Sequence, residues 1–427
     1  MIKDTIFALS SGRPPAAVSV IRSSGPRAFA AAEALAGRLP PLRRAVLMTL
    51  RVPSTGEPID EALVLRFDGP ASATGEDVVE YQCHGGRAVV DALHSALSAI
   101  DGMREAEPGE FTRRAFANER IDLTEAEGLA DLLEAETEAQ RRAALALASG
   151  GLKRQIDLWQ ARLVELSARA EAAIDYVDED EVGGADTRLS EDARALANEL
   201  SEWLARPRIE PLRDGVRVVV AGPTNAGKSS LINAIAESDR AIVTDIPGTT
   251  RDTIEVPLAI GGVPFVLVDT AGLRDTDDQV ERIGIDRARG AFASADILLW
   301  LGVSEDVPEH QRPITVQSKA DLDGVEPLTG AMAVSAVTRA GIDALVARIV
   351  ELSRSLLPGE DALALNRRQA TALAEVEAAL RDASVTSDVV LAADHFRGAR
   401  NALDRLTGRA GLEDMLDALF GRFCLGK

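Results

Sequence analysis

A glycine-rich segment between an apolar run and a helix-forming stretch constrains the fold of this chain more than any other feature. The mostly apolar run Val216–Ala221 is typical of a buried strand, and it leads directly into Gly222-Pro-Thr-Asn-Ala-Gly-Lys-Ser229. Backbone N–H groups of such a loop wrap phosphates, Lys228 neutralises their charge, and the Ser229 hydroxyl ligates Mg²⁺. The segment therefore predicts an α/β domain with a parallel sheet and a nucleotide phosphate site.

Two further segments have the order and spacing expected around such a site. Pro247-Gly-Thr-Thr250 places a threonine where a second protein ligand of Mg²⁺ is expected once a γ-phosphate is present. The apolar strand Pro264–Val268 ends in Asp269-Thr-Ala-Gly272. Asp269 can hold Mg²⁺ through a water, and the Gly272 N–H can meet the γ-phosphate.

The base-reading segment is expected after a later strand. Ile314–Val316 leads into Ser318-Lys-Ala-Asp321, where a carboxylate can accept both the N1–H and the exocyclic amine of guanine. Serine stands where this motif usually has asparagine. Further on, Ser335-Ala336 is expected to offer a backbone N–H to the guanine oxygen. The motifs together predict GTP rather than ATP as the substrate, and GTP hydrolysis as the reaction.

The position directly after the Gly272 motif, which often holds a water-orienting glutamine, is Leu273. Glu281 is the candidate to orient water in its place, and the alternative is a solvated carboxylate at a helix start. Asn225, inside the phosphate loop, could bind a monovalent cation together with carbonyls of Thr244–Thr249, and this cation would supply positive charge in place of an arginine finger. The alternative for Asn225 is a residue that only caps the loop.

The rest of the 427 residues indicates several domains. We interpret residues 1–118 as a compact α+β domain with strands at Ala17–Ile21 and Ala62–Phe67. Thr124 followed by Glu127 predicts a helix start, and helices then continue to about Tyr176 with a break at Gly150-Gly151. A stripe at alternating four- and three-residue steps predicts a helical bundle: Ile156, Trp159, Leu163, Leu166, Ala170 and Ala173.

The predicted boundaries are residues 1–118 for the N-terminal domain, 119–212 for the first helical part, 213–358 for the G domain and 359–427 for the second helical part. Helices are expected at about Ala193–Leu204, at Arg367–Leu380 and at Leu412–Phe423. We favour a helical domain interrupted by an inserted α/β domain, because the C-terminal helices are too few to form a core alone. Four consecutive independent domains are the alternative.

The net charge of −21 excludes binding of nucleic acid, DNA included, through the overall field of the protein, so RNA would need a local basic patch or a basic partner. The two cysteines, Cys83 and Cys424, fit a reducing cytoplasm. The start of the chain lacks a signal-peptide pattern, and the longest apolar run, Ile297–Val303, is too short to span a membrane.

Several segments resemble the MnmE (TrmE) family of tRNA-modification GTPases over essentially the full chain. In the N-terminal half they are Thr74–Glu80 with Cys83–Gly86, Pro108–Phe116 and Ile121–Glu127. In the second half they are Asn225, Thr244–Asp252, Asp269–Arg274 with Val280–Gly284, and the terminus Phe423-Cys-Leu-Gly-Lys427.

The resemblance implies a GTPase activated by K⁺ and by pairing of its G domains. It implies a tetrahydrofolate-binding N-terminal domain that holds a homodimer and takes 5,10-methylene- or 5-formyltetrahydrofolate. It also implies a heterotetramer with a MnmG-type flavoprotein that carries FAD and uses NADH. Together they would add an aminomethyl or carboxymethylaminomethyl group to carbon 5 of the wobble uridine of tRNA.

The residues implied are these. The GTP site would comprise Asn225, Ala226, Gly227, Lys228, Ser229, Ser230, Thr244, Asp245, Ile246, Pro247, Gly248, Thr249, Thr250, Asp269, Thr270, Ala271, Gly272, Lys319, Asp321, Ser335 and Ala336. Mg²⁺ would be held by Ser229 and Thr250, and K⁺ by Asn225, Thr244, Ile246 and Thr249. The catalytic residues would be Glu281, acting as a base through water, Lys228 and Cys424. Folate would contact Arg22, Glu80, Arg120 and Lys427.

Without the resemblance, some of these residues have plainer interpretations. Arg22 is a surface charge at a strand edge, Glu80 faces solvent, and Cys83 is a small core residue. Cys424 is either a packed hydrophobe or a thiol whose pKa is lowered by Arg422 and Lys427. Arg120 stands where the family usually has lysine. The rival functions are an RNA- or ribosome-associated GTPase switch without modification chemistry, and a metal-insertion GTPase.

Overall fold

The structure is a computed structural model, and it describes residues 4–175, 187–238, 241–243, 254–269, 292, 294–322, 326–359, 362–409, 413–421, 423 and 426. By spatial contact the chain divides into two compact units, residues 1–130 with 404–427 and residues 131–403. None of the helices in the described ranges is long and apolar enough to cross a bilayer.

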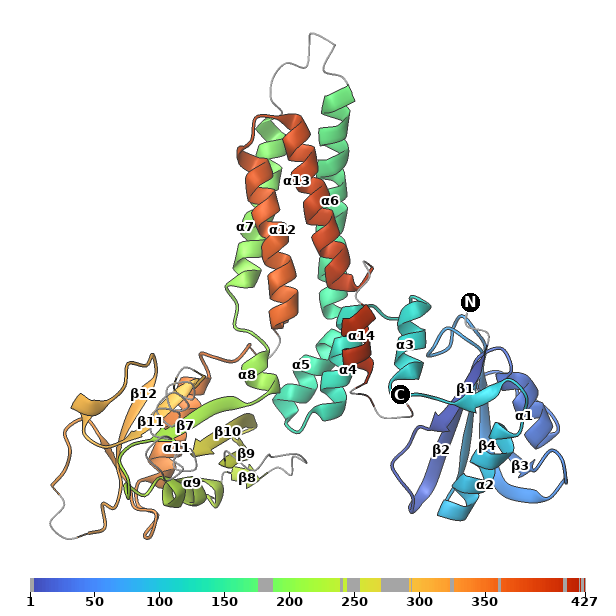
Figure 1. The fold of residues 1–427 in the computed structure, drawn as a ribbon, viewed down its shortest axis with the longest axis horizontal. Coiled ribbons are helices and arrows are strands. Elements are labelled where there is room, and N and C mark those ends of the chain that lie inside the picture. The colour runs from blue at the N-terminus through green and yellow to red at the C-terminus, as the bar shows by residue number, and fades with distance from the viewer. Residues whose placement is uncertain are drawn as a thin grey trace, which may run out of the picture. The chain divides into compact units, whose positions relative to one another are not determined.

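The first unit is built on a six-stranded sheet, drawn in blue in Figure 1. Its strands are β1 (Thr5–Leu9), β2 (Ala16–Ser24), β3 (Val46–Arg51), β4 (Pro58–Phe67), β5 (Val78–Gly85) and β6 (Met103–Glu105). Their order is β3-β4-β5-β2-β1-β6, and only the β1–β6 pair is parallel. The predicted α+β class and the two predicted strands are confirmed, since β2 and β4 contain them.

The two faces of this sheet differ in chemistry. Helices α1 (Ala28–Ala36) and α2 (Arg87–Ser98) cover one face and enclose an apolar core that includes Tyr81 and Cys83. Cys83 is buried and donates to the Ser19 carbonyl at 3.5 Å, and burial raises the pKa of its thiol. The interpretation of Cys83 as a small core residue is therefore confirmed. The short helix α3 (Glu110–Ala117) belongs to the opposite face, where Phe111 packs on Ile6 and Ala8.

The end of the chain belongs to the same unit. Helix α14 (Glu413–Phe420) packs through Phe420, together with Phe423, on Ala126 and Ala130 of α4 (Leu123–Glu134). Gly426 then lies on the end of β1, where the Ser10 hydroxyl donates to its carbonyl at 2.8 Å. A Cβ on Gly426 would lie 2.1 Å from the Leu9 carbonyl oxygen, so only glycine fits here.

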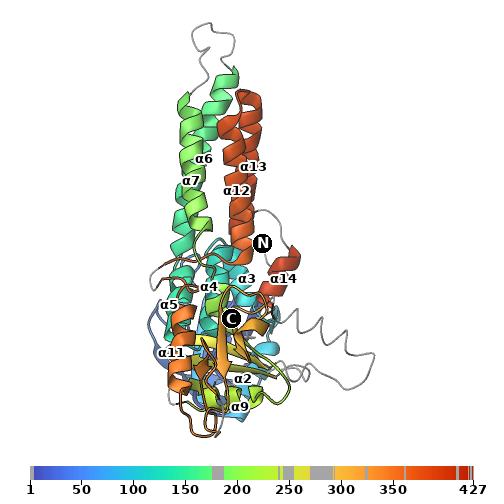
Figure 2. The same ribbon diagram turned by 90° about the vertical axis from the view of Figure 1, so that its left-hand side faces the viewer.

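The second unit contains a bundle of long helices and a seven-stranded sheet. The bundle consists of α5 (Glu138–Ala148), α6 (Gly151–Asp175), α7 (Thr187–Leu204), α12 (Arg367–Val385) and α13 (Val389–Thr407), and the last four lie side by side in Figures 1 and 2. The predicted apolar stripe of α6 is buried from Ile156 to Ala170, and the break at Gly150-Gly151 is confirmed.

The predicted start of α4 at Thr124 is wrong by two residues. Asp122 is the residue whose carboxylate accepts from the Glu125 N–H at 2.9 Å, and Glu125 accepts from the Asp122 N–H at 2.8 Å. The same capping box therefore forms from an Asp–Glu pair. Thr124 is fully buried, and its hydroxyl donates to Asp122 instead of capping the helix itself.

Segments on both sides of the α/β domain build the bundle together. Ser201 of α7 donates to Glu377 of α12 at 2.8 Å and accepts from Arg381 at 2.9 Å. The α/β domain is thus inserted in the helical region, as the sequence predicts. The exact boundaries of the four segments stay a prediction.

The inserted domain has a mostly parallel sheet in the order β13-β12-β11-β7-β10-β9-β8. The strands are β7 (Val216–Ala221), β8 (Ala241–Val243), β9 (Ile254–Ile260), β10 (Val263–Asp269), β11 (Ile297–Leu301), β12 (Pro313–Gln317) and β13 (Met332–Ala333). Helices α9 (Lys228–Ala236) and α11 (Ile342–Ser353) pack on it, and the short α8 (Glu210–Arg213) precedes β7. Five strands, β13, β12, β11, β7 and β10, run parallel, so their carboxyl ends meet along one edge.

Candidate functional site

The phosphate loop lies at the carboxyl edge of the parallel strands, between β7 and α9. Gly222 has φ +142°, and a Cβ there would lie 2.4 Å from the Leu301 carbonyl oxygen. Gly227 has φ +88° and stands at the N-terminus of α9. These two glycines let the chain turn tightly from strand to helix, and the backbone N–H groups of such a loop at a helix N-terminus can hold phosphates.

Lys228 and Ser229 begin α9 and point back toward the strand ends. The Lys228 ammonium is buried and donates to the carbonyls of Gly222 and Pro223 at 3.1 and 2.8 Å. The Ser229 hydroxyl donates to Asp269 Oδ2 at 2.5 Å. Asp269 ends β10, which is the direct neighbour of β7, and it is buried. Sheet order thus brings together two oxygens that lie 40 residues apart.

The segment Ser318–Asp321 follows β12 and is tied to the phosphate loop. The Ser318 hydroxyl donates to the Ala226 carbonyl at 2.6 Å, and the Lys319 ammonium donates to the Asn225 carbonyl at 2.8 Å. Asn225 itself has φ +60°, a left-handed conformation that is unfavourable for most side chains but tolerated by asparagine. Ser318, which departs from the usual motif, therefore still links the two loops.

The remaining described nucleotide residues lie on the same edge. Asp321 is exposed, as a base-reading carboxylate must be. Ser335 follows β13, but its N–H donates to the Ala340 carbonyl at 2.9 Å and its hydroxyl accepts from the Thr338 N–H at 3.0 Å. Ser335 thus shapes the turn, and the backbone N–H expected at the guanine oxygen would come from Ala336.

Several candidates fall outside the described residues: Thr244, Asp245, Ile246, Pro247, Gly248, Thr249, Thr250, Thr270, Ala271, Gly272, Glu281, Cys424 and Lys427.

A second candidate site lies on the α3 face of the N-terminal sheet. Arg22 and Glu80 are direct neighbours on β2 and β5, and two guanidinium nitrogens donate to the carboxylate at 2.9 and 3.0 Å. The Arg22 guanidinium also lies over the Phe111 ring, 5.7 Å from its centroid. Arg120 is exposed, and its Nε donates to the Ser72 carbonyl at 3.2 Å. Arg22 and Glu80 are thus paired with each other and are not isolated surface charges.

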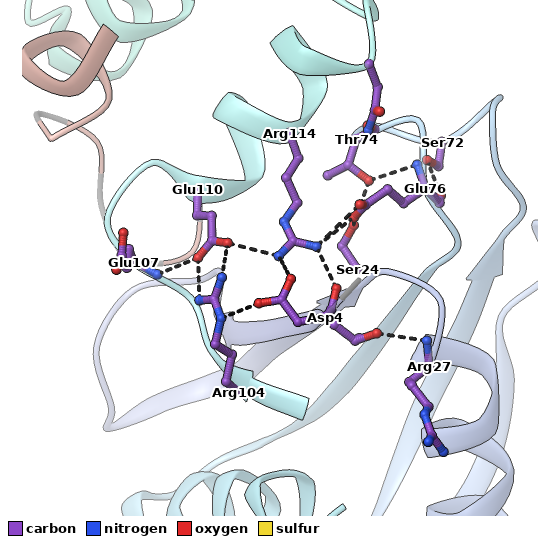
Figure 3. A network of polar contacts seen from close by, with 12 residues as sticks. Asp4, Ser24, Arg27, Ser72, Thr74, Glu76, Arg104, Glu107, Glu110 and Arg114 are labelled. Carbon is purple, nitrogen blue, oxygen red and sulfur yellow. Dashed lines mark hydrogen bonds and ion pairs between the residues drawn. The ribbon is translucent and has the colours of Figure 1, made fainter. Parts of the chain in front are cut away.

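Sequence reasoning missed a buried ion network on this face (Figure 3). Arg114 of α3 is 1% exposed and donates to Asp4, Glu76 and Glu110. Glu76 belongs to the segment Thr74–Glu80 and Arg114 to Pro108–Phe116, two segments singled out as family signatures only. A charged residue at an inward position of a short amphipathic helix is the signal that could have revealed the network.

Two family models match this chain. The model described as the MnmE helical domain matches residues 123–424, and the one described as the GTP-binding protein TrmE N-terminus matches residues 5–120. The tRNA modification GTPase MnmE of Erythrobacter litoralis is 54% identical over 425 residues, which cover 99% of this chain and 100% of that protein. The protein with the same name from Novosphingobium aromaticivorans is 53% identical over 435 residues, with the same coverage.

Among solved structures, the G domain of the T. maritima FeoB iron transporter covers 32% of this chain and 98% of its own length, at 24% identity and a TM-score of 0.25. A score this low supports no argument.

The fold and the first site define a P-loop protein in which the segment Ser318–Asp321 contacts the phosphate loop. More specifically, the chain belongs to the MnmE family of tRNA modification GTPases, since the similarity spans both chains almost entirely. Membership makes it a GTP hydrolase of tRNA modification.

Proposed function

We propose that this chain hydrolyses GTP with Mg²⁺ and K⁺ and uses a reduced folate, together with a flavoprotein, to modify carbon 5 of the wobble uridine of tRNA. The observation that carries the first part is the junction of the phosphate loop with the segment Ser318–Asp321. The family relationship carries the second part.

The described oxygens fit Mg²⁺. Ser229 Oγ and Asp269 Oδ2 lie 2.5 Å apart at the mouth of the phosphate loop, and both are the hard oxygen donors that Mg²⁺ prefers. Ser229 would ligate the ion directly, Asp269 would hold it through water, and Thr250 would complete the protein ligands. When bound, the ion neutralises charge on the β- and γ-phosphates.

K⁺ would be held by the Asn225 side chain with Thr244, Ile246 and Thr249. The support from described residues is the left-handed backbone of Asn225, which Lys319 holds through the carbonyl. A cation there would stabilise negative charge that develops on the phosphates during cleavage. Lys228 would neutralise the phosphates from the other side, and Glu281 would orient the attacking water.

The second site would bind 5,10-methylene- or 5-formyltetrahydrofolate. The pterin of a folate carries the same donor pattern as guanine, and Glu80 offers a carboxylate to it. Arg22 would orient that carboxylate, and the exposed Arg120 suits the glutamate tail. Lys427 and Cys424 would join this site from the end of the chain. Gly426 supports this, because it contacts Ser10, and Ser10 is two residues beyond Ala8, the residue that pairs with Arg22 across β1 and β2.

A homodimer through the N-terminal domain is supported by an apolar surface on the same sheet face. Val18, Leu47 and Leu63 are 54%, 61% and 40% exposed, although they lie on strands whose opposite face is a packed core. Leu47 pairs directly with Leu63 across β3 and β4. A second copy of the chain would remove this surface from water. The dimer would join an MnmG-type flavoprotein, with FAD and NADH on that partner, in a cytoplasmic heterotetramer that acts on tRNA.

The experiment that tests the GTPase mechanism is hydrolysis by the purified chain in KCl and in NaCl at equal ionic strength, with Mg²⁺. We expect a rate at least several-fold higher in K⁺, because the Asn225 site would select the larger ion. An Asn225→Ala variant should lose this difference. Equal rates in the two salts would contradict the cation site and favour a GTPase switch without modification chemistry.

A further inference from the structure

Helix α3 is attached to the sheet through a buried guanidinium. The two terminal nitrogens of Arg114 donate to the Asp4 carbonyl and carboxylate at 3.0 Å, to Glu110 at 2.9 Å, and to both oxygens of Glu76 at 3.2 and 3.3 Å. A charge this deeply buried is stable only when it is well paired, so the three partners are held in one geometry. Figure 3 shows that they come from the start of β1, the loop before β5 and α3 itself.

Glu76 extends this geometry into the loop formed by residues 72–77. Its carboxylate accepts from the Ser24 hydroxyl at 2.7 Å, and the Ser24 hydroxyl lies 2.7 Å from that of Thr74. The Glu76 carbonyl accepts from the Ser72 hydroxyl at 2.5 Å. Ser24, Ser72 and Thr74 are all buried. The loop is therefore fixed to β2 on one side and to Arg114 on the other.

The same loop holds the candidate folate contact Arg120. The Ser72 carbonyl accepts from Arg120 Nε, and the Thr74 carbonyl accepts from the Asn118 side chain at 2.8 Å. Gly75 has φ +80°, and a Cβ on it would lie 2.8 Å from Asn118 Cβ and 3.1 Å from Arg120 Cγ. Arg120 lies beyond the end of α3, so contacts with the loop set its side-chain position.

We propose that Arg114 and Glu76 are positioning residues for the reduced-folate site. They act through the loop of residues 72–77 on Arg120, although neither is among the candidate folate contacts. The inference rests on the proposed folate binding. It assigns a function to the segments Thr74–Glu80 and Pro108–Phe116, which the nucleotide chemistry leaves unused.

The test compares Arg114→Lys with Arg104→Lys in the full-length protein. Arg104 is the matched control, because it pairs with Asp4 and Glu110 of the same network at 2.6 and 2.5 Å but its described contacts do not include the loop. The probe is 5-formyltetrahydrofolate, titrated calorimetrically well below the unfolding temperature of both variants. We expect the Kd to rise about tenfold for Arg114→Lys, as for a displaced binding group, and less than about twofold for Arg104→Lys. GTP hydrolysis should be unchanged in both.

A double-mutant cycle with Arg120→Ala separates positioning from general destabilisation. In the Arg120→Ala background, Arg114→Lys should add less than about a twofold change in Kd. Three outcomes would overturn the positioning inference and leave the proposed folate function intact. They are fully additive effects of the two substitutions on the Kd, equal losses of affinity in the Arg104 and Arg114 variants, and an unchanged Kd in Arg114→Lys. A wild-type chain that binds no reduced folate would overturn the proposed folate function and this inference with it. If Arg114→Lys does not fold, Glu76→Gln keeps the size of the side chain and permits the same comparison.

Discussion

At the scale of single residues, Ser318 shows how the chain accommodates a departure from its motif. Its hydroxyl can donate only one hydrogen bond, and it donates this bond to the Ala226 carbonyl of the phosphate loop at 2.6 Å. An asparagine would have offered a longer side chain with two donors and an acceptor. The serine therefore keeps the contact between the two loops but can make fewer further hydrogen bonds than an asparagine.

We expect Ser318→Ala to weaken GDP and GTP binding about five-fold, because one hydrogen bond contributes about 1 kcal/mol. Ser318→Asn should bind at least as tightly as the wild type. The Kd values for both nucleotides, measured with fluorescent analogues, check this. Thr315→Ala on the preceding strand is the control and should leave the Kd unchanged. A wild-type Kd in Ser318→Ala would show that the contact does not support the site.

At the scale of secondary-structure elements, α3 is held by buried ion pairs as well as by apolar packing. Burial raises the pKa of Glu110, but hydrogen bonds from Arg104, the Glu107 N–H and Arg114 outweigh it, so the net pKa lies below the ordinary value of 4.5. The pKa of Asp4 is also lowered: burial raises it, and Arg104 and Arg114 lower it more. Carboxylates with lowered pKa values stabilise the folded state while they remain ionised.

The stability of the N-terminal domain should therefore decline on acidification. Ionised Glu110 adds to the free energy of unfolding. This contribution is fully present above about pH 4.5, the pKa of Glu110 in the unfolded chain, and is lost as the pH falls through its lower pKa in the folded state. Urea unfolding at pH 7, 5 and 4, followed by a probe in the N-terminal domain, should show this decline. Glu110→Gln should be less stable at pH 7 and should lose less on acidification. Parallel curves for the two proteins would contradict the assignment.

Elements with strong periodicity are predictable from this sequence, and one long helix was nevertheless missed. The α6 stripe and β7 were found because apolar side chains repeat at the period of the element. Helix α13 was not predicted, although Asp388 accepts from the Val390 N–H at 2.9 Å as an N-cap. Apolar residues then recur at alternating four- and three-residue steps along the helix. The buried face of this helix is rich in alanine: Ala392, Ala393, Ala399 and Ala402 are buried beside Phe396, Leu403 and Leu406. Small side chains give a weak hydrophobic signal.

At the scale of the whole molecule, the two candidate sites lie in different compact units. The phosphate loop belongs to residues 131–403, whereas the end of the chain packs in the unit of residues 1–130 and 404–427. Phe423 and Gly426, on either side of Cys424, are both buried there. Cys424 itself lies outside the described residues, and we propose that it serves the modification chemistry and not the cleavage of GTP.

We expect Cys424→Ser to leave GTP hydrolysis nearly intact and to abolish tRNA modification. The measurements are phosphate release and the content of modified wobble uridine in tRNA from cells that carry the variant as their only copy. Gly426→Ala is a useful companion, because a Cβ there would displace the chain end from Leu9 while keeping the thiol. Equal loss of both activities in Cys424→Ser would contradict a separate role.

The amino-acid sequence alone is enough to predict the phosphate loop, the order of the nucleotide motifs and the helical character of the second region. These depend on local spacing, since glycines, a lysine and a serine within eight residues define one loop, and a repeat of 3.6 residues defines one helix. Which groups far apart in the sequence come into contact is seen only in the folded structure. Ser318 reaches Ala226, Arg22 faces Glu80, and Arg114 joins Asp4 to Glu76, because sheet order and the docking of α3 bring them together. Pairing across strands depends on register and on the energy of burying charge, and neither is encoded by spacing along the chain.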